Sequence, residues 1–161
     1  MKKPIKLYID TSVWNFALET ERSDCLMTNE FLQAIKSNEY SVFISDIVLS
    51  EILNAYEPRR SKLQELLNIY GYEMLNVDES TRDLANIYIK EGLIPQNEIN
   101  DSQHIAVATV NRCNLLVSWN FKHMVKAKVI MGVHYINHRE GFGLIDIVSP
   151  EHFLGKKGVE P

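Results

Sequence analysis

The sequence has few of the residues that define small disulfide or zinc scaffolds. It contains only two cysteines, Cys25 and Cys113, with no CxxC pair between them. Disulfide frameworks and zinc fingers need more cysteines at closer spacing. We therefore expect both cysteines to be reduced, buried residues of a cytosolic protein.

Long apolar segments are also missing. No apolar run approaches the length of a membrane span, and the lysines near the start are not followed by an extended apolar segment. We therefore expect neither a signal peptide nor a membrane association, and we predict a cytoplasmic protein.

The sequence lacks the glycine-rich and histidine motifs of several enzyme classes. It has no GxxxxGK[ST] phosphate loop, no GxGxxG turn, no GxSxG elbow and no HExxH zinc motif. The formal net charge of −4 argues against a broad basic surface for nucleic acid. It does not exclude a nuclease, because a carboxylate cluster that binds metal ions makes the metal-free chain acidic.

What is present is typical of one globular domain. The chain has 161 residues, of which 45% are hydrophobic and 24% charged. We predict a single domain over residues 1–155 and a short tail over residues 156–161. Helix and strand signals alternate, which favours an α/β fold with a mostly parallel sheet. The expected strands are residues 6–9, 41–44, 73–76, 115–118 and 144–148, and the expected helices are residues 12–18, 24–37, 46–56, 58–69, 78–91, 101–112 and 124–138, with a last short helix from Pro150.

Four polar residues fall where these elements meet. Asp10 ends the first strand, and Glu51 lies early in the helix after the second. Asp101 begins a helix, and Asn120 closely follows the fourth strand. Open parallel sheets bind ligands outside the carboxyl ends of their strands, so we expect these side chains to converge there.

Binding of divalent cations is a chemical reason for carboxylates to gather in one place. Two carboxylates about 4 Å apart repel by roughly 4 kcal/mol at an effective dielectric of 20, so a cluster needs cations to neutralise it. Mg²⁺ and Mn²⁺ prefer oxygen ligands and keep several waters. Such ions activate a water molecule and stabilise the oxygens of a phosphoryl displacement.

Each of these residues also has a purely structural interpretation. Asp10 can turn the chain at a strand end, and Glu51 can be a solvated helix residue. Asp101 and Asn120 can cap helices, which is common for both residue types. Independent capping does not account for the order in which all four occur.

The runs that carry these residues resemble the four motifs of PIN domains, in the same order and with similar spacing. The runs are residues 7–12 (LYIDTS), 50–52 (SEI), 100–108 (NDSQHIAVA) and 116–123 (LVSWNFKH), and residues 145–151 (IDIVSPE) resemble the closing strand of that family. The resemblance covers nearly the whole chain. It implies an α/β/α sandwich around a mostly parallel sheet of about five strands.

The resemblance also implies roles for individual residues. Asp10 and Asp101 correspond to metal ligands, and Glu51 to a third ligand that acts directly or through water. Such domains usually cleave RNA with Mg²⁺ or Mn²⁺ and leave a 5′-phosphate. Many are toxins of toxin–antitoxin pairs and many form homodimers, so an antitoxin and a second copy are the expected protein partners. Thr11, Ser12 and Ser118 would support the carboxylates.

Position 120 departs from the family, which often has a fourth Asp there. Asn120 offers a carbonyl oxygen without charge, so a second metal would bind more weakly and one-metal behaviour is an alternative. His104, His123 and Lys122 are weaker candidates for contacts with the substrate. For His104, a hydrogen-bonded structural role is the better interpretation.

Two other functions compete with a ribonuclease. HAD-like phosphohydrolases also begin with a strand that ends in Asp, but they need a second Asp two residues later, where this chain has Ser12. The stronger alternative is a PIN-like module that binds RNA or protein without catalysis, which Asn120 and the acidic charge leave open.

Overall fold

The computed structural model describes residues 2–155 and has the predicted α/β architecture. Five parallel strands form one sheet in the order β3-β2-β1-β4-β5. The strands are β1 (Ile5–Ile9), β2 (Tyr40–Ser45), β3 (Glu73–Leu75), β4 (Leu115–Val117) and β5 (Asp146–Val148). The helices are α1 (Thr11–Phe16), α2 (Asp24–Ala34), α3 (Asp46–Leu53), α4 (Arg59–Tyr70), α5 (Glu79–Lys90), α6 (Ile99–Val110), α7 (Ala127–Arg139) and α8 (Pro150–Leu154).

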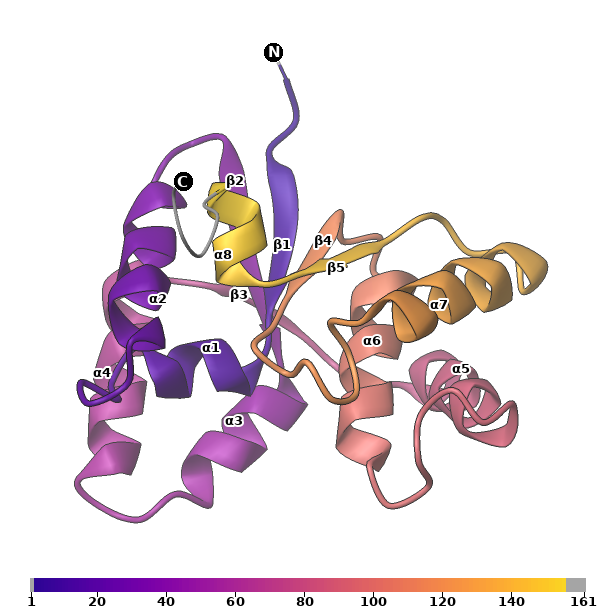
Figure 1. Cartoon of the computed structure of the whole chain (residues 1–161), viewed down its shortest axis with the longest axis horizontal. Helices are drawn as coiled ribbons and strands as arrows, with labels where there is room; N and C mark the ends of the chain where they lie inside the picture. The colour runs from indigo at the N-terminus through magenta and orange to yellow at the C-terminus, as the bar shows by residue number, and fades with distance from the viewer. Residues whose placement is uncertain (1, 156–161) are drawn as a thin grey trace.

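Helices cover both faces of the sheet. Figure 1 shows α1, α2, α4 and α8 on one side of the strands and α5, α6 and α7 on the other. Strand β1 lies in the middle, and its residues Leu7, Tyr8 and Ile9 are completely buried. A continuous apolar run is what a parallel strand covered on both faces requires. The predicted α/β/α sandwich is therefore confirmed.

Side-chain caps start the helices that directly follow β1 and β2. The Asp10 carboxylate accepts a hydrogen bond from the backbone N–H of Ser12 and begins α1. Ser45 Oγ accepts from the backbone N–H of Ile47 and begins α3, as its sequence position predicts. Because β1 and β2 are neighbours, these two starts bring α1 and α3 together at the carboxyl edge of the sheet.

Two helix starts differ from the sequence-based expectation by more than one residue. Helix α6 begins at Ile99, so Asp101 is the third residue of the helix rather than its entrance. Helix α7 begins at Ala127 rather than at Met124. The cause is Asn120. Its backbone carbonyl oxygen accepts hydrogen bonds from the backbone N–H groups of Met124 and Val125, and these bonds close a separate turn. Lys126 is then extended, with φ −151° and ψ 149°, so the helix has to start again after it.

Both tryptophans and both cysteines lie in the interior. Trp14 is completely buried and Trp119 is 6% exposed, so neither indole is available to stack on a base. Cys25 and Cys113 are buried and unpaired, as expected. Within residues 2–155, no buried side-chain nitrogen or oxygen lacks a hydrogen-bond partner. The predicted tail over residues 156–161 lies outside the described residues, and the domain division remains a prediction.

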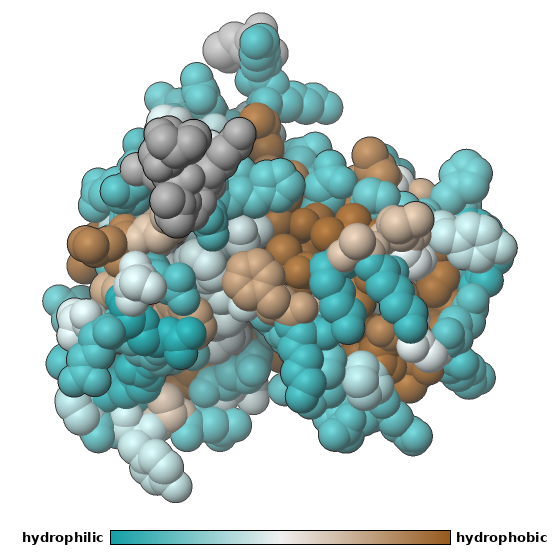
Figure 2. All heavy atoms as spheres, in the orientation of Figure 1, coloured by the Kyte–Doolittle hydropathy of each residue, from teal (hydrophilic) through white to brown (hydrophobic). Residues whose placement is uncertain are grey.

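The surface is mostly polar, with apolar side chains gathered over one region. Figure 2 shows brown side chains to the right of centre, where β4, β5 and α7 lie. Met131 and Tyr135 on α7 are 69% and 67% exposed, and Leu144 before β5 is 72% exposed. Among the described helices, none is long and apolar enough to cross a membrane.

Candidate active site

Asp10 is a buried carboxylate held by three hydrogen bonds. Its Oδ1 accepts from the Ser12 backbone N–H at 3.1 Å and from Ser12 Oγ at 2.6 Å. Its Oδ2 accepts from Ser118 Oγ at 2.6 Å. The side chain is only 3% exposed. Ser12 and Ser118 therefore fix both carboxylate oxygens of Asp10 at the end of β1.

Glu51 reaches the same edge from α3 and is anchored through one oxygen. Glu51 Oε1 accepts from Thr11 Oγ1 at 2.9 Å and from His104 Nε2 at 2.9 Å. Among residues 2–155, no hydrogen bond is made to Oε2 of this side chain, which is 34% exposed. The contacts of Oε1 thus leave Oε2 as the oxygen available to a cation or a water molecule.

His104 is the centre of a buried chain of polar side chains. Its Nδ1 lies 2.7 Å from Tyr8 Oη, which lies 2.7 Å from Ser45 Oγ. The ionised Glu51 carboxylate only accepts hydrogen bonds. Nε2 of His104 therefore carries a hydrogen and donates the hydrogen bond to Glu51. Both ring nitrogens are therefore used inside the protein, and the side chain is 3% exposed. His104 positions Glu51 and offers no free nitrogen to a substrate.

Asp101 and Asn120 are joined directly. Asn120 Nδ2 donates to Asp101 Oδ2 at 3.2 Å, while Asn120 Oδ1 accepts from the His123 backbone N–H at 2.9 Å. The backbone N–H of Asn120 donates to Ser118 Oγ. The carbonyl oxygen that the sequence offered to a metal is thus occupied by a backbone amide. The side-chain amide instead points its positive end at Asp101.

The structure adds Glu98 to the candidate residues, and the sequence analysis missed it. Within the described part of the chain, the group of acidic and histidine ligand atoms that all lie within 4.8 Å of one another is Glu98, Asp101 and His123. His123 Nε2 is 3.6 Å from Glu98 Oε1. Glu98 was expected within a loop. Its position three residues before Asp101 is the sequence signal that could have identified it, because the two residues are close together once the helix starts at Ile99. Lys122, which precedes His123 in the sequence, is exposed.

The surroundings of two carboxylates in this cluster disfavour their ionised form, and a bound cation would offset that cost. Burial raises the pKa of Asp10 above its ordinary value, although His104 and the two serines act against this. Burial, followed by the like charge of Glu98, raises the pKa of Asp101 despite the opposing charges of His104 and His123. Carboxylates that resist ionisation in this way are stabilised by a nearby positive charge.

Glu51 and His104 shift in the opposite sense, as a pair. Burial opposes the charge on Glu51, but the hydrogen bonds from His104 and Thr11 and the charge of His104 lower its pKa overall. Burial also opposes the charge on His104, but the Glu51 hydrogen bond and the charges of Asp10, Glu51 and Asp101 raise its pKa overall. His104 therefore sits among three carboxylates and partly neutralises them.

The oxygen atoms that remain fit a hard divalent cation. Glu51 Oε2 and Asp101 Oδ1 make no hydrogen bond within the described residues, and both are carboxylate oxygens of the kind that Mg²⁺ and Mn²⁺ prefer. Asp10 is held at the end of β1 by its serine contacts, and within the described residues Asp10, Glu51 and Asp101 do not form a group whose ligand atoms all lie within 4.8 Å of one another. The residues present are thus suited to hold such an ion, with water molecules as its remaining ligands.

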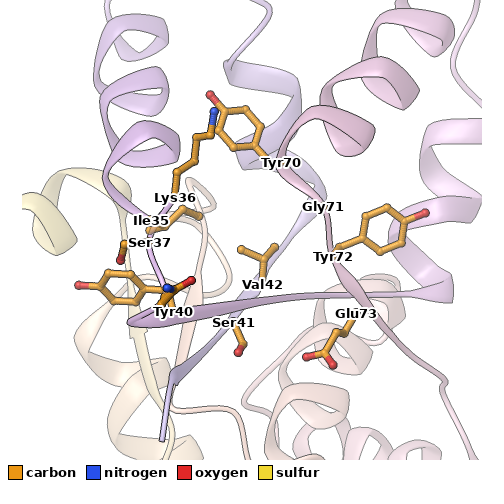
Figure 3. A pocket seen from close by; sticks show the side chains of 11 residues that line it. Ile35, Lys36, Ser37, Tyr40, Ser41, Val42, Tyr70, Gly71, Tyr72 and Glu73 are labelled. Carbon is orange, nitrogen blue, oxygen red and sulfur yellow. The ribbon is translucent and has the colours of Figure 1, made fainter. Parts of the chain in front are cut away.

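An open cavity on the protein lies away from this cluster. It has a volume of about 600 Å³ and is lined by the segment between α2 and β2, the start of β2, and the segment from the end of α4 into β3. Figure 3 shows Lys36, Tyr40, Tyr70, Tyr72 and Glu73 around it. These strand segments are amino-terminal, whereas the carboxylate cluster lies at the carboxyl edge. With one carboxylate, the cavity does not offer a metal-ligand set.

A parallel α/β/α sandwich with carboxylates gathered at the carboxyl edge of its central strands defines the class of protein. The chain belongs to the PIN domain family, whose model matches residues 7–123. The match covers all four runs that resembled the family motifs, so that prediction is confirmed.

Solved structures share the fold at low sequence identity. VapBC2 from Rickettsia felis, in a crystal structure bound to a DNA fragment from its promoter, matches with a TM-score of 0.59 and 17% identity, covering 90% of this chain and 98% of that one. DNA-bound VapBC from Salmonella typhimurium matches with a TM-score of 0.58 and 15% identity, covering 91% of this chain and 98% of that one. A comparison with curated proteins gave no match.

Proposed function

We propose that this PIN domain protein is a metal-dependent ribonuclease that hydrolyses RNA phosphodiester bonds with Mg²⁺ or Mn²⁺. The observation that carries the proposal is the convergence of Asp10, Glu51 and Asp101 around the buried His104 at the carboxyl edge of the sheet. The three carboxylates come from three separate elements of the chain. A fold needs no such concentration of buried and half-buried acids for stability, and a cation offsets its cost.

Each residue has a distinct role in this proposal. Asp10 and Asp101 bind the cation, and Glu51 binds it directly or orients the attacking water through Oε2. The bound cation would activate water and stabilise the charge that develops on the phosphate. Asn120 takes part as the donor that holds Asp101 in place, and Ser12 and Ser118 hold Asp10 in the same way.

A path for single-stranded RNA is available next to the cluster. A cavity of about 440 Å³ lies between α3 and α6, and its polar lining residues are Asp46, Ser50, Arg82, Asn100 and Gln103. Ser50 and Asn100 directly precede Glu51 and Asp101 in the chain. The uncharged polar side chains and the Arg82 guanidinium suit contacts with sugars and phosphates that do not depend on base sequence, and the Asp46 carboxylate in the same lining accepts from the Val77 backbone N–H.

We further propose that the protein acts as the toxin of a toxin–antitoxin pair. Its fold is shared with VapBC proteins that were crystallised on DNA, which supports an antitoxin partner. The exposed apolar side chains Met131, Tyr135 and Leu144 are consistent with a protein contact, including a homodimer. A small neighbouring gene whose product binds the protein and suppresses cleavage would support this role.

Cleavage of a mixed RNA pool tests the ribonuclease proposal. We expect cleavage with Mn²⁺ or Mg²⁺, none in EDTA, and product strands that carry a 5′-phosphate. Asp101→Asn should abolish cleavage with its fold intact, because it removes a charged ligand while keeping the size of the side chain. Asp83→Asn on the exposed face of α5 is the matched control and should cleave normally.

The alternative function is a PIN module that binds RNA or protein without catalysis. It is favoured by the hydrogen bond that takes the Asn120 carbonyl oxygen away from a metal. Unchanged cleavage by Asp101→Asn would refute the proposed site. RNA binding without cleavage in any of the metals would favour the module.

A further inference from the structure

We propose that a cavity at the amino-terminal edge of the sheet binds a nucleoside monophosphate. The cavity has a volume of about 620 Å³ and lies between the end of α6 and the segment that joins α7 to β5. Cavities of this size hold small organic ligands. Asp101 stands near the start of α6 and the cavity lies at its end, so the length of this helix separates the cavity from the acidic cluster. The inference therefore does not depend on the proposed ribonuclease activity.

The charge around this cavity is suited to an anion. Among the residues that the structure describes, no carboxylate lines it, although the whole chain has a formal net charge of −4. Two acids flank the segment between α7 and β5, and both have partners of their own. Glu140 accepts a hydrogen bond from Arg139, and the Asp146 carboxylate lies 3.3 Å from Nε2 of His134. The charged side chain in the lining is that of Arg112.

Arg112 offers an unpaired guanidinium. Within residues 2–155, its side chain makes no hydrogen bond, ion pair or contact with an aromatic ring. The other arginines each have a carboxylate or carbonyl partner; they are Arg22, Arg59, Arg60, Arg82 and Arg139. A guanidinium binds a phosphate through two parallel hydrogen bonds. Arg112 is therefore the group that would hold the phosphate.

The backbone of Arg112 supports a binding role for its side chain. Its φ is 58°, in the left-handed region where glycine is favoured. The position ends α6, because the next N–H, that of Cys113, donates back to the Ala108 carbonyl at 2.9 Å. Residues that are held in this conformation against their preference are concentrated at ligand sites.

Further hydrogen-bond donors line the cavity beside Arg112. Asn114 Oδ1 accepts from the Lys6 backbone N–H at 2.8 Å, and this contact leaves Nδ2 of Asn114 as an available donor. The backbone N–H of Gly143 makes no hydrogen bond in the described part of the chain. A Cβ at Gly143 would meet no atom within 4 Å, so a ligand has room to approach this backbone closely.

The apolar part of the lining suits a nucleobase. It includes Val110 and Phe142, and Phe142 is half-buried. A base stacks favourably on a phenylalanine ring. Inorganic phosphate would leave this ring unused, whereas a polyphosphate would carry more charge than one guanidinium can offset. A single phosphate on a nucleoside matches both parts of the cavity.

Titration calorimetry of the whole protein with AMP, in EDTA, tests the proposal. EDTA keeps cations out of the carboxylate cluster, so the phosphate cannot bind there through a metal ion. We expect saturable binding of AMP, weaker binding of inorganic phosphate, and no binding of adenosine at the same concentrations. Arg112→Gly suits the left-handed backbone and should stay folded, yet bind AMP at least about tenfold more weakly. Arg22→Ala, which removes an exposed guanidinium elsewhere, is the control and should bind AMP normally.

A second variant and the location of binding keep the test decisive. Phe142→Leu should weaken the binding of AMP more than that of inorganic phosphate, and thermal melts confirm that each variant is folded. In amide NMR spectra, AMP should shift the signals of Asn114 and Gly143 and leave that of Asn100, at the other end of α6, unchanged. The proposal is overturned if AMP does not bind, if adenosine or inorganic phosphate binds as tightly as AMP, or if Arg112→Gly binds AMP like the wild type.

Discussion

Replacement of Asn120 by Asp should destabilise the metal-free protein and make its stability depend strongly on Mn²⁺. In the wild type, Asn120 Nδ2 donates to Asp101 Oδ2 at 3.2 Å. Asn120→Asp puts a second carboxylate oxygen where that donor stands. The contact with the His123 backbone N–H is retained, because a carboxylate oxygen accepts it equally well. The substitution therefore changes one interaction from attraction to repulsion.

The expected loss of unfolding free energy follows from the distance between the side chains at positions 101 and 120 and from their exposure to solvent. Two unit charges about 4 Å apart repel by roughly 4 kcal/mol at an effective dielectric of 20. Both side chains are only half-buried, so solvent screening reduces this to about half, and the lost hydrogen bond adds about 1 kcal/mol. A net loss of about 2–3 kcal/mol lowers the melting temperature of a chain of this size by roughly 4–12 °C.

The assay is thermal unfolding at pH 7 in EDTA and in Mn²⁺. Asn38→Asp, at an exposed position remote from the cluster, is the matched control for the added charge. Mn²⁺ should raise the melting temperature of Asn120→Asp more than that of the wild type, since binding to the folded state adds stability by mass action. Acidification should also restore the metal-free variant, because a proton on either carboxylate removes the repulsion. If Asn120→Asp melts in EDTA like Asn38→Asp, the reasoning about this contact is refuted.

Three further expectations follow from the same contacts. Asp10→Asn should leave the metal-free melting temperature at pH 7 unchanged or higher, because burial penalises its charge and the amide carbonyl still accepts from Ser12; a clear drop would make Asp10 a structural cap. Tyr8→Phe should cost about 1–3 kcal/mol of unfolding free energy by chemical denaturation, because His104 Nδ1 loses its buried partner; no loss would mean that the chain of hydrogen bonds contributes little. The pKa of His104 is raised above its ordinary value of 6.5, so its stabilising contribution is complete below that pH and disappears as the pH rises through the raised value. Metal-free stability should fall over that range in the wild type, and His104→Gln should flatten this fall; equal slopes would contradict the assignment.

The fold was predictable from local patterns because these patterns are strong in this chain. The strand that ends at Asp10 and the Ser45 cap are found where the sequence predicts them. The start of α7 was not predictable, because it depends on a turn that Asn120 closes through its backbone and side chain. Helix propensity alone assigns Met124 and Val125 to the helix, although in the structure they close the turn.

The candidate site was predictable in outline and not in its contacts. Asp10, Glu51 and Asp101 could be selected because each stands beside the carboxyl end of a strand or at the start of a helix. The role of His104 could not be predicted, since its partner Tyr8 lies 96 positions away on a strand that appears simply apolar. Glu98 was missed because its importance depends on where α6 begins and on the position of His123 in space.

Calorimetric titration with Mn²⁺ tests the central claim, that the acidic cluster holds the cation on which RNA cleavage depends. The comparison uses the wild type, Asp10→Asn, Asp101→Asn and the control Asp83→Asn, each also assayed for cleavage. We predict that the wild type and the control bind Mn²⁺ alike and cleave RNA. Asp10→Asn and Asp101→Asn should each bind it at least about tenfold more weakly and should not cleave. Mn²⁺ binding that is equally strong in all four proteins would contradict the account.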